Sequence, residues 1–294
     1  MLPIAMVLGI LFHDSFEAIE FIAPYLIFIM LFITFCKVDG AHLHPTRFSW
    51  YLLGVQILGG ILVYLALLPF GNVLAMGTFI CIFCPTATAA PVITGMLGGS
   101  VTRLATFSIV SNIAVAILAP ILFTLIGGSQ AGDISLIGCI LVIAKRVLPV
   151  IILPLILALL LRWRLPRLTD AIGSKQSISF YIWAVSLLLV VGRSVSFVMK
   201  EPPTEVPLMV TLAVVAGLAC VVQFAIGRIV GRRFGDKISG AQGLGQKNTV
   251  LAIWMAMTFL NPVSSVAPAA YIAWQNTINS LQLYLKARKE GRKE

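Results

Sequence analysis

The fold of this chain is decided by the stretch SGAQGLGQKNT at residues 239–249. The stretch lies in an apolar segment long enough to cross a membrane, yet its glycines make a poor continuous helix. A second stretch, CPTATAAP at residues 84–91, interrupts another apolar segment, because proline removes a backbone donor and clashes with the preceding turn. Unwound backbone at membrane depth is tolerated only where it is buried in protein or lines a cavity. Two broken membrane helices are therefore predicted, although simple packing kinks would leave the same pattern.

The composition places the rest of the chain in a bilayer. Of its 294 residues, 59% are hydrophobic and 11% charged, whereas a soluble domain carries about 25% charged residues. The net charge of +10 gathers in loops and in the C-terminal tail, which argues for membrane orientation and against nucleic-acid binding. A spanning helix needs about 20 apolar residues, so we predict about ten spans and a lipid bilayer as the main partner. The predicted spans are 2–12, 21–36, 48–69, 72–97, 102–126, 147–163, 177–198, 206–231, 239–260 and 264–286.

Basic residues in alternate loops set the orientation. Lys and Arg accumulate in the loops after the second, fourth, sixth and eighth spans and in the C-terminal tail. We therefore expect both termini to be cytoplasmic. Lys145 and Arg146 do not fit this alternation, and we expect residues 134–146 to lie along the outer interface before the sixth span begins.

Short sequence similarities indicate an internal repeat. The motif Leu-Pro-aliphatic opens the first span at residues 2–4 and the sixth span at residues 148–150. Val-Gln followed by Gly recurs in the third span at residues 55–60 and in the eighth at residues 222–227. Five spans repeated once must enter the membrane from opposite sides, so we predict an inverted repeat of residues 1–130 and 131–294.

Lys247 carries the functional argument. It lies ten residues after Lys237 and fifteen before Pro262, which places it roughly 15 Å into a hydrocarbon core about 30 Å thick. A cation at that depth costs about 2.5–3.5 kcal/mol and usually faces a cavity and has a partner. Every Asp and Glu of the chain falls in a loop, a tail or a span end. An ammonium without an acidic partner predicts a site for an organic anion, unless the lysine is held neutral or reached by cytoplasmic water.

Other polar or helix-breaking residues of the broken spans and their neighbours complete the predicted substrate site. Each of them is also typical of an ordinary hydrogen bond between membrane helices. With Lys247, the predicted substrate-binding residues are Gln246, Asn248, Thr249, Thr88, Ala90, Pro91, Asn112 and Asn276.

At these residues the chain resembles the bile acid:sodium symporter family in its bacterial members. The resemblance is strongest at Cys84-Pro85 with Thr88-Ala89, at residues 111–120, at Gly245 with Asn248-Thr249, and at Trp274 with Asn276. It implies ten helices, two crossing broken helices, and a core of spans three to five and eight to ten that rocks against a panel of spans one, two, six and seven. It also implies the bacterial inner membrane and a cargo of bile acids, steroid sulfates or smaller carboxylates.

The resemblance also implies sodium sites, and the sequence departs from them. Ala90-Pro91 stands where the family has a Ser-Asn pair, Gly243 where it has a glutamate, and Leu104 at another ion position. Lys247 replaces a glutamine, so an ammonium would occupy the space of an ion. We therefore expect no cofactor and transport that does not need sodium, moving the anion alone, in exchange, or with protons if Lys247 titrates. The ion-site positions by resemblance are Gln56, Ser108, Ser111, Gly243, Leu244 and Gln246.

Three alternatives stay open beside this interpretation. One is a sodium-coupled symporter of the usual family type. Another is a metalloid exporter, because the thiol of Cys84 in the broken fourth span would suit a soft ligand. The least favoured is a membrane enzyme, since the sequence offers no acidic cluster and its histidines, His13, His42 and His44, all lie in loops. We predict no catalytic residue, no metal site and no protein partner.

Overall fold

In the computed structural model the described residues form helices joined by short connections, with no β-strand among them. The described residues are 7–8, 11–12, 15, 19–36, 44–87, 90–127, 136–174, 178, 181–182, 185–186, 188–189, 192, 199 and 202–290. They form the α-helices α3 (Ala23–Cys36), α4 (Arg47–Leu67), α5 (Asn72–Phe83), α6 (Ala90–Leu97), α7 (Val101–Gly127), α8 (Leu136–Arg164), α9 (Pro166–Ser174), α11 (Val206–Arg233), α12 (Lys237–Gly245), α13 (Thr249–Phe259) and α14 (Val266–Glu290). Short 3-10 turns are η1 (Glu20–Ile22), η3 (Leu68–Phe70), η4 (Pro203–Glu205) and η5 (Pro262–Ser265).

Four helical stretches are long and apolar enough to cross a bilayer, so the chain is an all-α membrane protein. They are Arg47–Phe70, Val101–Gly127, Ile140–Arg164 and Pro203–Arg233. The apolar helices α3, α5 and α13 are shorter, with 14, 12 and 11 residues. The predicted first span lies mostly, and the predicted seventh span largely, outside the described residues.

One sequence prediction is wrong. Residues 134–146 were expected to lie along the interface, but α8 runs without a break from Leu136 to Arg164. The physical reason is that the segment before Lys145 is apolar and contains no proline, so nothing interrupts the helix there. The long side chain of Lys145 is exposed, so the residue can lie inside the helix without being buried. The prolines at 149 and 154 lie inside α8 instead of opening a span.

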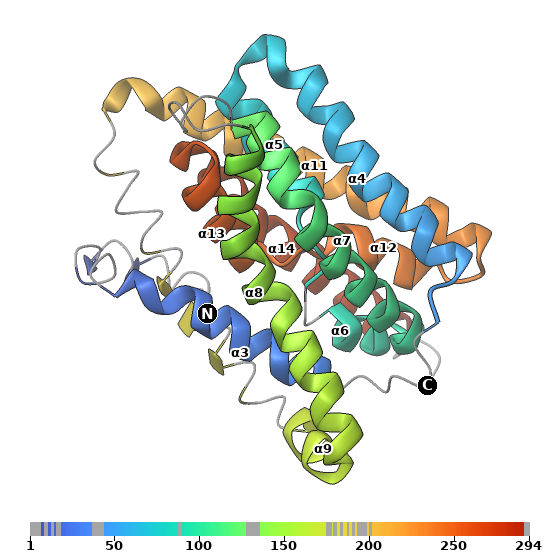
Figure 1. The fold of residues 1–294 in the computed structure, drawn as a ribbon. Coiled ribbons are helices and arrows are strands. Elements are labelled where there is room, and N and C mark those ends of the chain that lie inside the picture. Colours follow the sequence, from blue (N-terminus) through green and yellow to red (C-terminus); the bar gives the residue numbers. More distant parts are fainter. Residues whose placement is uncertain are drawn as a thin grey trace.

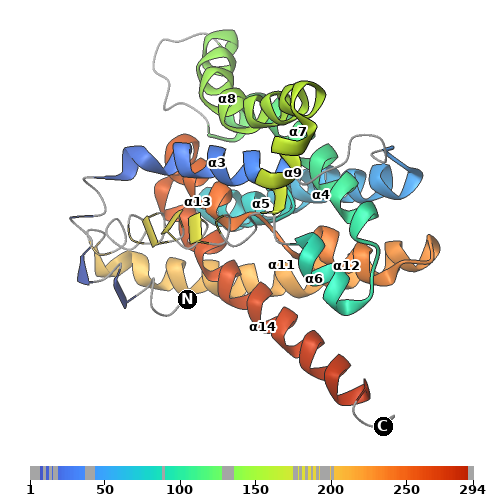
Figure 2. The ribbon, with the colours of Figure 1, turned by 90° about the horizontal axis from the view of Figure 1, so that it is seen from below.

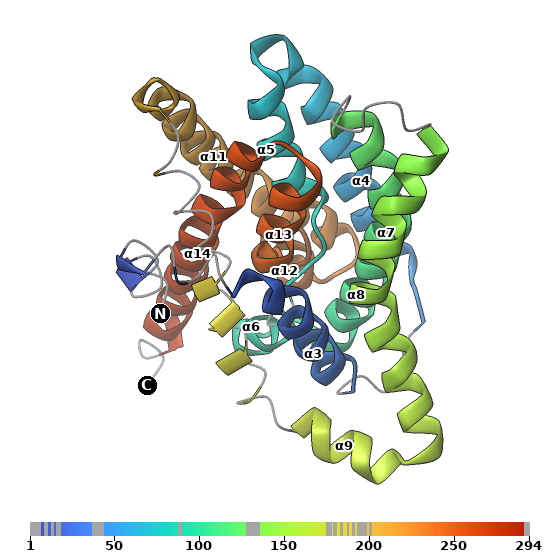
Figure 3. The ribbon, with the colours of Figure 1, turned by 60° about the vertical axis from the view of Figure 1, so that its left-hand side comes forward.

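The broken helices occupy the centre of the molecule. Figure 3 shows α5, α12 and α13 between α4, α7 and α8 on one side and α11 and α14 on the other. Nearly every side chain of α12 and α13 is buried, and so is every residue of α5 from Leu74 onward. In Figure 1, α4 and α8 lie on the outside of this group, and in Figure 2, α14 runs outward to the C-terminal end. A polar break in α5 or α12 is therefore shielded by the surrounding helices.

Glycines and an aspartate fix α12 against its neighbours. A Cβ added at Gly227 of α11 would collide with the backbone of Gly240 of α12, so the two helices touch along their backbones. Asp236 caps α12, because its Oδ1 accepts from the backbone N–H of Ser239 at 3.0 Å. Its Oδ2 accepts from the backbone N–H of Ser100 at 3.1 Å, which joins the turn before α12 to the turn before α7. These contacts set the depth of α12 in the bundle.

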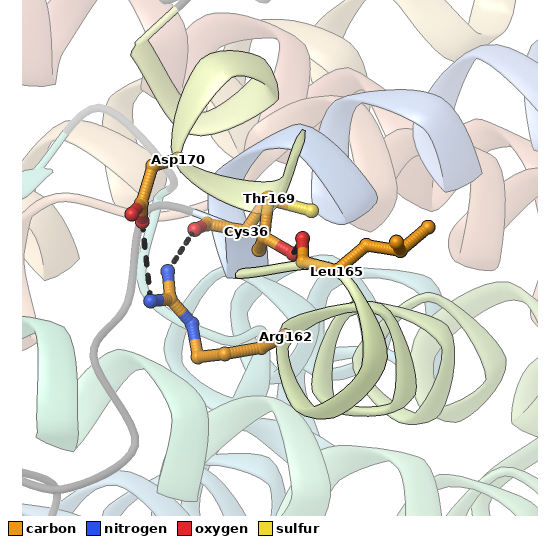
Figure 4. Close-up of polar contacts among 5 residues, drawn as sticks. All are labelled: Cys36, Arg162, Leu165, Thr169 and Asp170. Atoms are coloured by element: carbon orange, nitrogen blue, oxygen red, sulfur yellow. Dashed lines mark hydrogen bonds and ion pairs between the residues drawn. The ribbon is translucent and has the colours of Figure 1, made fainter. Parts of the chain in front are cut away.

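Arg162 joins α3, α8 and α9 at one end of the molecule (Figure 4). Its Nη1 donates to Asp170 Oδ1 at 3.2 Å, and its Nη2 donates to the backbone oxygen of Cys36 at 2.6 Å. The second bond meets a free carbonyl at the C-terminal end of α3, where a cation is favoured by the helix dipole. The guanidinium therefore links the consecutive helices α8 and α9 to α3, which is distant in the sequence.

Candidate functional site

The two interruptions meet each other as a short antiparallel pair. The chain leaves helical geometry after Phe83 and again after Gly245, and Thr86 and Lys247 form an isolated bridge. The N–H of Ala87 donates to Gln246 O at 2.9 Å, and the N–H of Asn248 donates to Pro85 O at 2.8 Å. The backbone groups freed by the two breaks thus satisfy one another, which is how an irregular backbone is tolerated inside a membrane protein.

The two bridged residues each send their side chain to the other broken helix. Thr86 Oγ1 donates to Gly243 O at the end of α12, at 2.8 Å. Lys247 Nζ donates to Ile82 O at 2.7 Å and to Cys84 O at 3.1 Å, at the end of α5. We call the paired breaks, residues 84–87 and 246–248, the crossing. The C-terminal end of each broken helix is therefore met there by a donor from the other break, in one case a neutral hydroxyl and in the other the terminal nitrogen of a lysine.

Lys247 is sealed within the protein. Only 1% of the residue is exposed, and its backbone is held by Gln275 of α14, whose Oε1 accepts from Lys247 N at 2.9 Å. No Asp or Glu is buried among the residues whose burial the structure describes. No acidic partner for Lys247 can be found in the sequence, whereas in the structure its Nζ donates to two backbone carbonyls. Its terminal nitrogen therefore meets the negative end of a helix, and the contacts do not aim it at an open space.

All the carbonyl oxygens at the end of α5 have partners from other elements. Because Pro85 lacks an N–H, Cys81 O has no helical donor, and Gln223 Nε2 of α11 donates to it at 3.3 Å. Gln56 Nε2 of α4 donates to Phe83 O at 2.7 Å and to Cys84 O at 3.2 Å. Gln56 is oriented in turn by Ser111 of α7, whose hydroxyl donates to Gln56 Oε1 at 2.8 Å.

The end of α12 is supported by neutral groups only. Tyr271 of α14 donates its hydroxyl to Gly245 O at 2.9 Å. The same hydroxyl accepts from Gln223 Nε2 at 2.9 Å, so Gln223 contacts the end of α5 directly and is linked to the end of α12 through Tyr271. The repeated Val-Gln motif thus provides two buried glutamines that serve the crossing, Gln56 from α4 and Gln223 from α11.

Several buried polar atoms near the crossing have no hydrogen-bond partner among the residues that the structure describes. Asn248 is 4% exposed and caps α13 through Oδ1, which accepts from Leu251 N at 3.2 Å, while its Nδ2 has no partner. Because the cap fixes which end of the amide is the oxygen, the free atom is the donor. The Oε1 of Gln246 and the Oδ1 of Asn112 are also without partners. Such atoms are costly to leave unpaired, so they mark where a ligand or water is expected to bind.

The apolar residues that stand at sodium-ligand positions by resemblance, Ala90, Gly243 and Leu104, do not fit sodium. Ala90, Leu104, Leu244 and Phe107 belong to one buried apolar cluster. A Cβ added at Gly243 would lie 3.1 Å from side-chain carbons of Leu52 and Phe107, so apolar groups fill the space where a carboxylate is expected by resemblance. Hard cations need oxygen ligands, and this cluster provides none from its side chains. At another ion position by resemblance, Gln56 lies beside the ammonium of Lys247, since both donate to Cys84 O.

Of the remaining predicted site residues, some are buried near the breaks and others are not. Thr249 and Pro91 are buried beside the breaks, and Thr88 lies outside the described residues. Ser108 is buried on α7, where its backbone oxygen accepts from Asn112 Nδ2 at 2.7 Å. Asn276 is exposed on α14, and its neighbour Gln275 contacts the crossing in its place. Sequence reasoning missed Gln275 and Tyr271, because a single polar residue in a spanning helix does not reveal which way it points.

The thiol of Cys84 is hydrogen-bonded within the crossing. Its Sγ donates to Asn248 O at 3.0 Å, and the residue is fully buried. Within the described part of the chain, no group of three or more His, Cys, Asp or Glu side chains is placed to hold a metal ion. The thiol therefore acts here as a hydrogen-bond donor between the two broken helices.

Comparison with models of known protein families and with curated proteins gives no match for this chain. Its function must therefore be inferred from its own residues: two broken helices that pair at the centre of a membrane protein, one buried lysine between them, and unpartnered amide atoms beside it.

Proposed function

We propose that this chain is a secondary transporter of small organic anions that works by alternating access. The observation that carries the proposal is the pairing of two broken helices at the centre of a helical membrane protein. Interrupted helices of this kind form substrate sites in secondary transporters, because their ends present uncompensated backbone dipoles. No catalytic group is needed for this function.

The sign of the cargo follows from the charges at the crossing. Two helix N-terminal ends, those of α6 and α13, and two C-terminal ends, those of α5 and α12, lie at the breaks. Each end is equivalent to roughly half an elementary charge, so the four nearly cancel, and a protonated Lys247 leaves a net charge of about +1. The unpartnered Nδ2 of Asn248 adds a donor at the N-terminal end of α13. This combination favours a carboxylate, sulfate or similar anion.

The exchange of side chains at the bridge supports an inverted repeat. Thr86 and Lys247 occupy equivalent places, each donating to the C-terminal end of the opposite broken helix. Gln56 and Gln223 recur before a glycine at the same spacing in α4 and α11, and both donate to the end of α5. We propose two halves, residues 1–130 and 131–294, related by an axis near the bridge. A core of spans three to five and eight to ten would then move against a panel of spans one, two, six and seven, in a bacterial inner membrane with both termini cytoplasmic.

A thermal-shift screen tests the proposal first. The purified protein is heated in detergent with bile acids, steroid sulfates, keto acids and hydroxy acids, and with neutral or cationic analogues of each. An anion is expected to raise the unfolding midpoint in proportion to the logarithm of its concentration, because it binds only the folded state. Stabilisation by the neutral analogues alone would defeat the proposal. Anions that bind are then tested for uptake into proteoliposomes.

A matched pair of variants locates the site. Asn248→Ser keeps an oxygen that caps α13 but removes the amide nitrogen Nδ2. Asn261→Ser is the control, because Asn261 also caps a helix, accepting from Val263 N at 2.9 Å, but at η5 beyond the end of α13. We expect the response to anions to weaken in Asn248→Ser and to persist in Asn261→Ser. Equal responses in the two variants would place the anion elsewhere.

A further inference from the structure

The C-terminal end of α5 is built as a cation site. Five consecutive carbonyl oxygens, from Cys81 to Pro85, each accept a hydrogen bond from outside α5. Two of them, those of Ile82 and Cys84, converge on one atom, Lys247 Nζ. Unwound carbonyls and half-helix C-terminal ends are the groups that hold small cations in secondary transporters. Here the group that they hold is a side chain of the same protein.

The position of Lys247 is fixed at three points. Its backbone forms the bridge with Thr86, and its N–H donates to Gln275 Oε1 at 2.9 Å. Its carbonyl accepts from Gln275 Nε2 at 3.4 Å. An amide of α14 therefore brackets the lysine backbone, while the side chain reaches across to α5. A cation attached in this way cannot dissociate as a free ion does.

We propose that the ammonium of Lys247 is a covalently attached cation that fills the site at the end of α5, so that transport by this chain needs no alkali cation. The statement about transport rests on the proposed function, whereas the occupied cation site is a property of the folded protein by itself. It also agrees with the apolar cluster at the other ion position, where Gly243 faces Leu52 and Phe107. Removing the ammonium should then reopen a site that a free cation can enter.

The test is cation-dependent stability of the purified protein. Wild type, Lys247→Met and Lys247→Gln are heated in sodium, methylammonium or choline chloride at equal ionic strength. Wild type is expected to unfold at the same midpoint in all three salts. Lys247→Met is expected to be less stable in choline and to recover stability in sodium or methylammonium, rising with the logarithm of their concentration. Lys247→Gln, which keeps a neutral donor, is expected to recover with them as well, because the positive charge is still missing.

Lys286→Met is the matched control. Lys286 Nζ donates to Met96 O at the end of α6, at 2.8 Å, but in an exposed position. This variant is expected to show no difference between the salts, because water can replace the lost donor. A sodium response that is equal in wild type, Lys247→Met and Lys286→Met would overturn the proposal, and so would a Lys247→Gln variant that is as stable as wild type in choline.

A second readout decides the matter if the Lys247 variants do not fold. Uptake of the anion into proteoliposomes of wild-type protein is measured with sodium on both sides, on one side, or replaced by choline. Equal rates are expected in all three, and a strict need for a sodium gradient would overturn the proposal. If no anion is transported at all, the proposed function fails, and the stability measurements still decide whether the cation site is filled by Lys247.

Discussion

Replacing Tyr271 by Phe tests how the end of α12 is supported. Tyr271 is completely buried on α14. Its hydroxyl donates to Gly245 O at 2.9 Å and accepts from Gln223 Nε2 at 2.9 Å. Phenylalanine keeps the ring and its packing, so the change removes these two hydrogen bonds and the contact of the hydroxyl with the thiol of Cys220. Gly245 O then loses its side-chain donor, while Gln223 keeps its bond to Cys81 O.

The expected loss of stability is about 1–2 kcal/mol. A hydrogen bond between membrane helices contributes about 0.6 kcal/mol on average and about 1.7 kcal/mol at most. Leaving a buried carbonyl without a partner costs about 1–3 kcal/mol. The lower part of this range applies, because one of the two former partners of the hydroxyl is still bonded elsewhere.

The assay is reversible unfolding in mixed detergent micelles, with Tyr64→Phe as the control. Tyr64 also donates its hydroxyl to a side chain, Asn72 Oδ1 at 3.1 Å, but in an exposed position. We expect the control to lose less than about 0.5 kcal/mol. Tyr271→Phe as stable as wild type, or no less stable than Tyr64→Phe, would show that this hydroxyl does not support the crossing.

Four further predictions concern other contacts of the structure and the proposed transport. Gln56→Leu is expected to lose about 1–3 kcal/mol in unfolding measurements, because a buried carbonyl at the end of α5 loses its donor; unchanged stability would contradict this. Gly227→Ala is expected to lose about 1–3 kcal/mol through collision with Gly240, whereas Gly59→Ala, with open space around it, should not. Arg162→Lys is expected to lose about 1 kcal/mol or less, since one ammonium cannot reproduce both bonds of the planar guanidinium; a larger loss would require a contact beyond those two. Proteoliposomes preloaded with the transported anion are expected to take up labelled anion several-fold faster than empty ones, and equal rates would argue against exchange.

The breaks in the two central helices could be predicted because their cause is chemical. Proline at position 85 removes a donor, and the glycines of residues 240–245 lower helix propensity, so the sequence itself marks where the helices end. The glutamines at positions 56 and 223 could be predicted because they recur with a glycine at the same spacing. The structure places both beside the breaks.

The partners of Lys247 could not be predicted, because they are backbone carbonyls and carry no sequence signature. The orientation of α14 was equally hidden. Successive residues of a helix point about 100° apart, so Gln275 and Asn276 cannot both face the crossing. Hydropathy does not choose between them, since Trp274 beside them is 42% exposed in a helix of mixed polarity. The choice depends on packing against α11, where the indole N–H of Trp274 donates to Ala213 O at 3.0 Å.

The two bridged residues differ in charge, because Thr86 is neutral and Lys247 carries one positive charge when protonated. This single charge has a consequence for the proposed transport. A second lysine at position 86 would place two ammonium groups on the two bridged segments, and each would cost about 2.5–3.5 kcal/mol at membrane depth. With one lysine, a bound monoanion makes the site neutral, whereas the empty site keeps a charge of about +1. Moving the empty, charged site past the low-dielectric part of the protein is therefore harder than moving the loaded, neutral one. A carrier of this kind should return faster with an anion than without one, which is why exchange is expected to exceed net uptake.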